Sequence, residues 1–326
     1  MADRQAGHDG GITSATSSAK TSMAAILAGD AQRIGTQASQ CSHVSVAIPW
    51  AAAVAVTADG AVDTSWTFSP AIVVALIGYT GFYVFRWQRS RAEGGARAAG
   101  FGRLALWLAG VGCIALALLS PLDRLGEQFA VFHMVQHLLL ADLAAVALTL
   151  GLTRWLLRPA TRRLQRIERA AGPFAHPAFG AVAYVGVMWF WHIPVMYDAT
   201  LTNATVHTLE HLSFAAAGLL YWWHLLSPIR SRHRMNGVGI IIYMASTKVL
   251  VGFLGVLLAF APGLLYESYS REGDLWGITA LEDQQAAGAL MGLEQTLIMG
   301  VVLVFLFTRM LSEADRDDER AERYAA

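Results

Sequence analysis

Long apolar runs alternate with short polar segments from about residue 69 to residue 310. Each run is about twenty residues long, which is the length that a helix needs to cross the hydrocarbon core of a bilayer. This alternation is typical of helical membrane proteins that cross the bilayer several times. We therefore predict an all-α, polytopic bundle of about seven transmembrane helices, at residues 69–87, 103–120, 129–151, 178–194, 205–227, 237–261 and 286–309.

The charges between these runs predict how the helices are oriented. Arginine gathers in alternate connections, at residues 86–103, 154–169 and 230–234. The other connections are poor in positive charge, because Arg124 and Arg271 each stand among acidic residues and residues 195–204 contain no basic residue. Basic loops are retained on the cytoplasmic side of a membrane. Seven helices then leave the N-terminus outside and the C-terminus in the cytoplasm.

Composition divides the chain into three segments. Residues 1–68 form a polar N-terminal tail, predicted to be disordered, with an apolar segment at 44–56 that is too short to span a membrane. Residues 69–310 form the transmembrane domain. Residues 311–326 mix acidic and basic side chains and are predicted to form a charged cytoplasmic tail, either solvated or in a short exposed helix.

The overall composition narrows the class of function. Of the 326 residues, 55% are hydrophobic and 15% are charged, and the formal net charge is zero. Soluble domains carry about 25% charged residues, and nucleic-acid-binding domains carry a basic patch, so neither class fits. Cys41 and Cys113 are far apart, which excludes a disulfide framework and a Cys-x-x-Cys motif.

Two pairs of histidines stand at the entry of two apolar runs. His133 and His137 form one pair, and His207 and His211 form the other. Residues four apart lie on one face of a helix, so both imidazoles of a pair reach a common point. The predicted topology puts both pairs just below the outer membrane surface, and it puts His192, at the end of the fourth helix, at the same level.

Five histidines in one layer of a membrane predict a metal site, because ionisable groups inside a bilayer are costly and usually functional. Imidazole binds copper, zinc and iron, and a thioether adds preference for Cu(I). The thioethers predicted near this layer are those of Met134, Met196 and Met291. Glu210 and Gln136 are placed to orient the imidazoles. A zinc protease would need His-Glu-x-x-His, whereas the fifth helix reads His-Thr-Leu-Glu-His. Haem between two helices and metal-free hydrogen bonding between helices stay as alternatives.

Besides Glu210, three charged residues lie well inside predicted spans: Asp142, Lys248 and Glu294. Asp142 follows His133 by nine residues, about 180° around a helix, so it should not share the histidine face. Asp142 and Lys248 lie at similar depth, and we predict a buried, structural ion pair between them. Glu294 has no evident partner in the sequence.

At three stretches the chain resembles the CtaG family of bacterial cytochrome c oxidase assembly proteins. These stretches are Ser120-Pro121-Leu122 with the following residues 133–140; residues 191–194 with Tyr197-Asp198 and residues 207–211; and Asp283 to Met291. The resemblance implies a seven-helix, non-enzymatic assembly factor that handles copper at the outer face of the bacterial cytoplasmic membrane. It implies metal roles for His133, His137, His192, His207 and His211, and lesser ones for Met134, Asp283 and Met291.

Our leading hypothesis is that the histidines hold Cu(I) transiently and pass it to a cytochrome c oxidase subunit, with a soluble copper chaperone as a possible second partner. The lipid bilayer is the surrounding medium, and no nucleic acid is expected. The alternatives are a haem-binding membrane oxidoreductase that uses the histidine pairs as axial ligands, and a metal-free scaffold for oxidase subunits.

Overall fold

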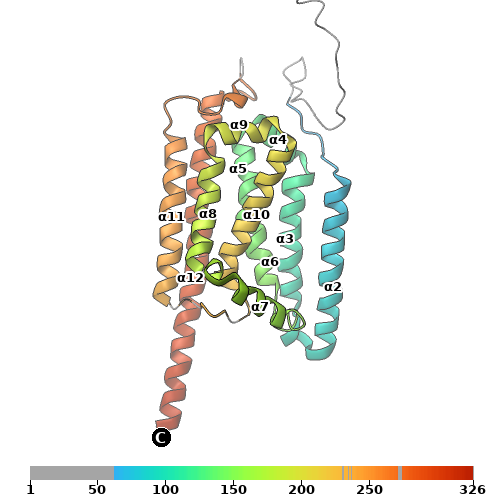
Figure 1. The fold of residues 1–326 in the computed structure, drawn as a ribbon, viewed down its shortest axis with the longest axis vertical. Helices are drawn as coiled ribbons and strands as arrows, with labels where there is room; N and C mark the ends of the chain where they lie inside the picture. Colours follow the sequence, from blue (N-terminus) through green and yellow to red (C-terminus); the bar gives the residue numbers. More distant parts are fainter. Residues whose placement is uncertain (1–61, 230, 234, 236, 271–273, 326) are drawn as a thin grey trace, which may run out of the picture. The chain divides into compact units, whose positions relative to one another are not determined.

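The computed structural model describes residues 62–325, apart from residues 230, 234, 236 and 271–273. Throughout this part of the chain the architecture is all-α: it contains no strand, and its one β contact is an isolated bridge from Leu275 to Ile278. The predicted fold class, an all-α polytopic membrane protein, is confirmed (Figure 1). Residues 1–61 of the tail predicted at 1–68, including the apolar segment at 44–56, lie outside the described residues.

Long helical segments correspond to each of the predicted spans. They are α2 (Pro70–Ala98), α3 (Phe101–Leu119), the continuous run of α5 (Ala130–Leu138), η1 (Leu139–Ala144) and α6 (Ala145–Gly151), then α8 (Pro177–Trp191), α10 (Ala204–Leu226), α11 (Gly237–Ala259) and α12 (Ala280–Ala325). Short helices lie between them: α4 (Pro121–Gln128), α7 (Thr161–Ala171), η2 (Gly172–Ala175), α9 (Pro194–Thr202) and η3 (Glu267–Tyr269).

By length and apolar character, five helical segments of the described chain are able to cross a membrane, namely α2, α3, α5–α6, α11 and α12. The count becomes six if α8 and α9, which are bent by 74° at the break between them, form one span. Helix α10 is not among them, because polar residues such as His207, Glu210 and His211 lower its hydropathy. The count of seven spans and the orientation of the termini stay predictions.

The two helices that carry the histidine pairs lie at the centre of this arrangement (Figure 1). Helix α10 packs against α8, α6 and η1, and α5 packs against α12. The α5–α6 span is 61% buried inside the protein, against 11% for α2. Helices such as α2 therefore present apolar side chains outward, as the outer helices of a membrane bundle do, and α5 and α10 are shielded by protein.

A π-helical turn interrupts the third predicted span directly after His137. Residues Leu139–Ala144 form η1, and α-helix resumes at Ala145. A π-turn adds a residue per turn and changes which side chains share a face. His137 and Asp142 consequently line the same small cavity. The expectation that Asp142 lies away from the histidine face is wrong, because that expectation assumed an unbroken α-helix.

Local signals set where the helices next to the site begin. The Asn203 side chain accepts the backbone N–H of Thr205 at 2.9 Å, which caps α10. Pro194 occupies the first turn of α9, where proline is favoured, and the chain bends just before it. His192 lies at this bend, directly after α8.

Helix α12 is longer than predicted. It begins at Ala280 and continues without a break to Ala325, whereas the hydropathy pattern predicts a span of 286–309 only. Glu282 and Asp283 in its first turn favour a helix start. Residues 311–325 are rich in Ala, Glu and Arg, which have high helix propensity, so the charged segment continues the helix.

Candidate metal centre

The two histidine pairs face each other across α5 and α10. The ring centroids of His133 and His207 are 5.5 Å apart, and those of His137 and His211 are 5.9 Å apart. His192 completes the group, with its ring centroid 6.4 Å from that of His137. The structure therefore brings these five residues into one connected group, which we call the histidine cluster.

Glu210 lies between the two pairs. Its side chain is fully buried, and its carboxylate oxygens lie 3.3 Å from Nε2 of His133 and 3.3 Å from Nε2 of His137. Two sets of possible ligands share it, namely His133 with His137 and His207 with His211; in each set the ligand atoms lie within 4.8 Å of one another. Glu210 was predicted to orient the imidazoles from outside, whereas it occupies the centre.

Several polar atoms of this centre have no hydrogen-bond partner within the protein. They are Nδ1 of His133, Nδ1 of His137, Nε2 of His207 and Nε2 of His211, while Nε2 of His137 and Oε2 of Glu210 have only the 3.3 Å ion-pair contacts given above. Buried polar atoms are nearly always paired, and an uncompensated buried carboxylate is expensive. In the described residues no lysine or arginine pairs with Glu210. A cation bound between Glu210 and one ring nitrogen of each neighbouring imidazole would compensate the carboxylate charge and pair several of these atoms.

Aromatic side chains enclose the centre. The ring of Phe214 stacks on His137 with centroids 4.1 Å apart, and the buried Tyr197 ring lies 5.0 Å from His133 and stacks on Tyr266 at 3.8 Å. These contacts exclude water and hold the imidazoles in place. Phe214 could not have been singled out from the sequence, and Tyr197 was noticed only within the stretch that supports the family resemblance.

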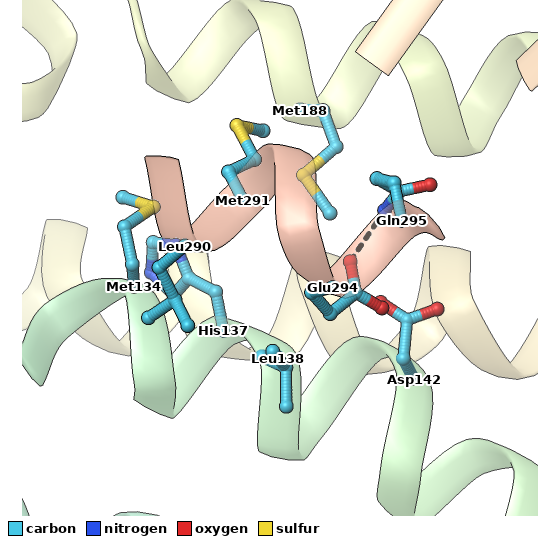
Figure 2. Close-up of a pocket in the computed structure, with 9 residues that line it drawn as sticks. All are labelled: Met134, His137, Leu138, Asp142, Met188, Leu290, Met291, Glu294 and Gln295. Atoms are coloured by element: carbon cyan, nitrogen blue, oxygen red, sulfur yellow. Dashed lines mark hydrogen bonds between the residues drawn. The ribbon is translucent and has the colours of Figure 1, made fainter. Parts of the chain in front are cut away.

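A small cavity of about 20 Å³ lies beside His137 (Figure 2). A cavity of this size holds about one water-sized particle. Its lining combines thioethers with buried acids, and consists of Met134, His137, Leu138, Asp142, Met188, Leu290, Met291, Glu294 and Gln295. Met134 and Met291, both predicted as accessory residues, are thus close to the histidine cluster.

The predicted ion pair between Asp142 and Lys248 does not form. The Asp142 carboxylate accepts the Tyr184 hydroxyl at 2.8 Å and the Trp222 indole N–H at 2.9 Å, and no salt bridge between described residues includes Lys248. Lys248 belongs to α11, which packs against α12 and α8. The two residues were expected at equal depth in the membrane. Residues in one layer need not face each other, because the rotation of each helix decides where its side chains point.

Two further predicted roles are corrected. Asp283 belongs to neither ligand set; its carboxylate accepts the backbone N–H groups of Ala130 at 2.8 Å and Val131 at 3.1 Å, at the start of α5. Gln136 points away from the imidazoles and donates to the Ala117 carbonyl at 2.9 Å. Both side chains fix the position of α5, and they affect the histidines only through that helix.

Comparison with known proteins agrees with this arrangement. A family model described as cytochrome c oxidase caa3 assembly factor (Caa3_CtaG) matches residues 81–313, which is more than half of the chain. No curated protein and no solved structure matches it. The matched region includes the whole histidine cluster together with Glu210, Met134 and Met291. The chain therefore belongs to the CtaG family of cytochrome c oxidase caa3 assembly factors.

Proposed function

We propose that this assembly factor binds copper as its cargo and supplies it to a cytochrome c oxidase, without catalysing a reaction itself. The supporting observation is the buried Glu210 carboxylate, which lies among imidazoles that each keep at least one ring nitrogen without a hydrogen-bond partner, at His133, His137, His207 and His211. Imidazole is a ligand for copper, zinc and iron, and copper binds nitrogen and oxygen ligands most tightly among the divalent first-row metals. The neighbouring thioethers favour Cu(I).

We place the copper site near the outer face of the bacterial cytoplasmic membrane. The arginine pattern of the loops supports this side, because it predicts an external position for α4 and α9. The histidine cluster adjoins α9 through Tyr197. His207 stands in the first turn of α10 and is only partly buried, which makes it the natural point of exchange with an oxidase subunit or a soluble copper chaperone.

The packing of the site supports a bare ion over haem. A porphyrin needs a broad slot between its axial ligands, whereas the cavity beside His137 is about 20 Å³ and Phe214 stacks directly on the ring. A metal-free scaffold would leave the polar atoms of the centre unpaired, and each buried, unsatisfied group costs about 1–3 kcal/mol.

Copper content is the deciding measurement. The full chain would be purified in detergent, loaded with Cu(I) without oxygen, desalted and analysed for copper and for its visible spectrum. We expect near-stoichiometric copper in the wild type and a large loss in His133→Ala/His137→Ala. The matched control is His224→Ala, because His224 lies on α10 but belongs to neither ligand set, and it should keep its copper.

The other outcomes favour the alternatives. A Soret band in the purified protein that is lost in the double variant would indicate that the histidines bind haem and not copper. If the wild type contains neither metal nor haem and the double variant still supports normal oxidase maturation, the histidines have only a structural role. The metal-free scaffold would then be the remaining hypothesis.

A further inference from the structure

We infer that His192 and Met134 form a second, softer metal site, selective for Cu(I), beside the centre that contains Glu210. The inference rests on the proposed function only in taking copper as the cargo. His192 is part of the histidine cluster, yet it belongs to neither ligand set that shares Glu210. The ring of His192 contacts Met188 and Met134 and not Glu210, so we assign it to a separate site.

The hydrogen bond at one ring nitrogen of His192 determines the state of the other. Nδ1 lies 2.6 Å from the Met188 carbonyl oxygen. A carbonyl oxygen only accepts, so Nδ1 carries the hydrogen and donates it. No carboxylate lies within 4.0 Å of His192 in the described residues, and a buried ring without such a partner is best accommodated neutral. Nε2 then has a free lone pair.

The lone pair on Nε2 of His192 faces the lone pairs of the Met134 sulfur. Nε2 of His192 lies 3.5 Å from Sδ of Met134, and a thioether sulfur has no hydrogen to donate. Two acceptors that face each other in a buried place stabilise nothing by themselves. A soft cation that both atoms coordinate removes this mismatch, and imidazole with thioether is a ligand set that suits Cu(I).

A cavity on the Met134 side of this pair, which His192 itself does not line, supplies room and further thioethers. Met134 from α5, Met188 from α8 and Met291 from α12 all line it (Figure 2). Its volume of about 20 Å³ suits one ion. Thioethers are poor ligands for hard divalent cations such as Mg²⁺ and Ca²⁺, so this site selects by ligand softness, whereas the Glu210 centre offers only nitrogen and oxygen.

His137 connects the two sites. Its ring lies 3.3 Å from the Glu210 carboxylate and also lines the thioether cavity. Cu(I) moves between the sites by exchanging one ligand for another at His137, with no change in oxidation state. The soft site therefore holds the ion away from water after it has entered through the outer histidines.

The test is Met134→Leu, which removes the sulfur and keeps the side-chain volume nearly unchanged. The full chain in detergent would be loaded anaerobically with Cu(I) or with Zn²⁺, and metal content would be measured together with X-ray absorption at the copper edge. We expect copper–sulfur scattering in the wild type, its loss in Met134→Leu with copper retained through nitrogen and oxygen alone, and unchanged zinc content. Met196→Leu is the control, since Met196 lies in α9 outside the cavity lining.

His133→Ala separates the two proposals. It damages the Glu210 centre but leaves the thioether cavity, so the copper–sulfur signal should persist. Copper bound through nitrogen and oxygen alone in the wild type, unaltered by Met134→Leu, would overturn the soft site and leave the proposed function standing. A wild type that takes up no Cu(I) would overturn both.

Discussion

Glu210 illustrates how one residue determines the chemistry of its surroundings. Four imidazoles alone would form a neutral site, whereas a buried carboxylate among them attracts a cation into the protein interior. Its oxygens lie within 3.3 Å of ring nitrogens of His133 and His137, and it also belongs to the set with His207 and His211. The negative charge, more than any single imidazole, makes the centre suited to an ion.

Glu210→Gln tests this role, because it keeps the shape of the side chain and removes the charge. We expect the affinity for copper to fall by at least about tenfold, measured by competition with a Cu(I) chelator. Thermal unfolding of the metal-free variant should occur at the same or a higher temperature than for wild type, since an uncompensated buried charge has been removed. Unchanged copper affinity would contradict the central place of Glu210.

Asp142 has a structural role, through its hydrogen bonds to Tyr184 and Trp222. Asp142→Leu leaves both donors without an acceptor, and we expect a loss of about 1–3 kcal/mol per donor in the free energy of unfolding. Asp142→Asn keeps one acceptor oxygen and should be milder. The unfolding temperatures of the wild type and the two variants in detergent test this order of stability.

Lys248→Met is the matched control for the Asp142 series. Lys248 takes part in no described salt bridge, so this variant should unfold close to the wild-type temperature. A fall in the unfolding temperature as large as that of Asp142→Leu would support the ion pair between Asp142 and Lys248 that the sequence predicts.

At the scale of elements, the contact between α10 and η1 places the histidine pairs opposite each other. Gly218 of α10 lies directly against the backbone of Ala141 in η1, and an added Cβ there would come within 2.7 Å of the Ala141 Cα. Only glycine permits so close an approach. The π-turn and Gly218 together set the distance and rotation of the two helices that carry the site.

Gly218→Ala should therefore push α10 away from η1. Overpacking of this kind costs typically about 1–3 kcal/mol, and we expect both a lower unfolding temperature and weaker copper binding. Gly252→Ala in α11 is the control, because nothing lies within 4 Å of an added Cβ there and alanine favours helix. Equal effects of the two variants would show that the α10–η1 contact has no special importance.

At the scale of the whole molecule, orientation would determine which compartment supplies the proposed copper cargo. Figure 1 shows α4 and α9 at one end of the helices and α7 at the other, and α7 is rich in arginine. The positive-inside rule places α7 in the cytoplasm and α4 and α9 outside. In this predicted orientation the histidine cluster, which adjoins α9, lies toward the outer compartment.

Reporter fusions check this orientation. Alkaline phosphatase, which is active only outside the cytoplasm, should be active when inserted after Thr202 at the end of α9 and inactive after the C-terminus. A fluorescent protein that folds only in the cytoplasm should give the reverse result at the same two positions. If both patterns were inverted, the copper source would be cytoplasmic.

The sequence by itself determined the membrane class and predicted that the five histidines lie at one level along their helices. Both follow from position along the chain, because helix rise converts residue number into depth and apolar length is matched to the bilayer. Reading depth in this way correctly identified all five histidines as neighbours. It also identified Met134 and Met291 as residues close to them.

Only the tertiary structure decided which side chains face one another. The central place of Glu210, the contact of His192 with Met134 and the partners of Asp142 depend on how each helix is rotated about its axis. That rotation is set by packing between helices, by a glycine that admits a close approach and by one π-turn, none of which hydropathy encodes. Depth is a one-dimensional property of the chain, whereas a binding site is formed by rotation and packing in three dimensions.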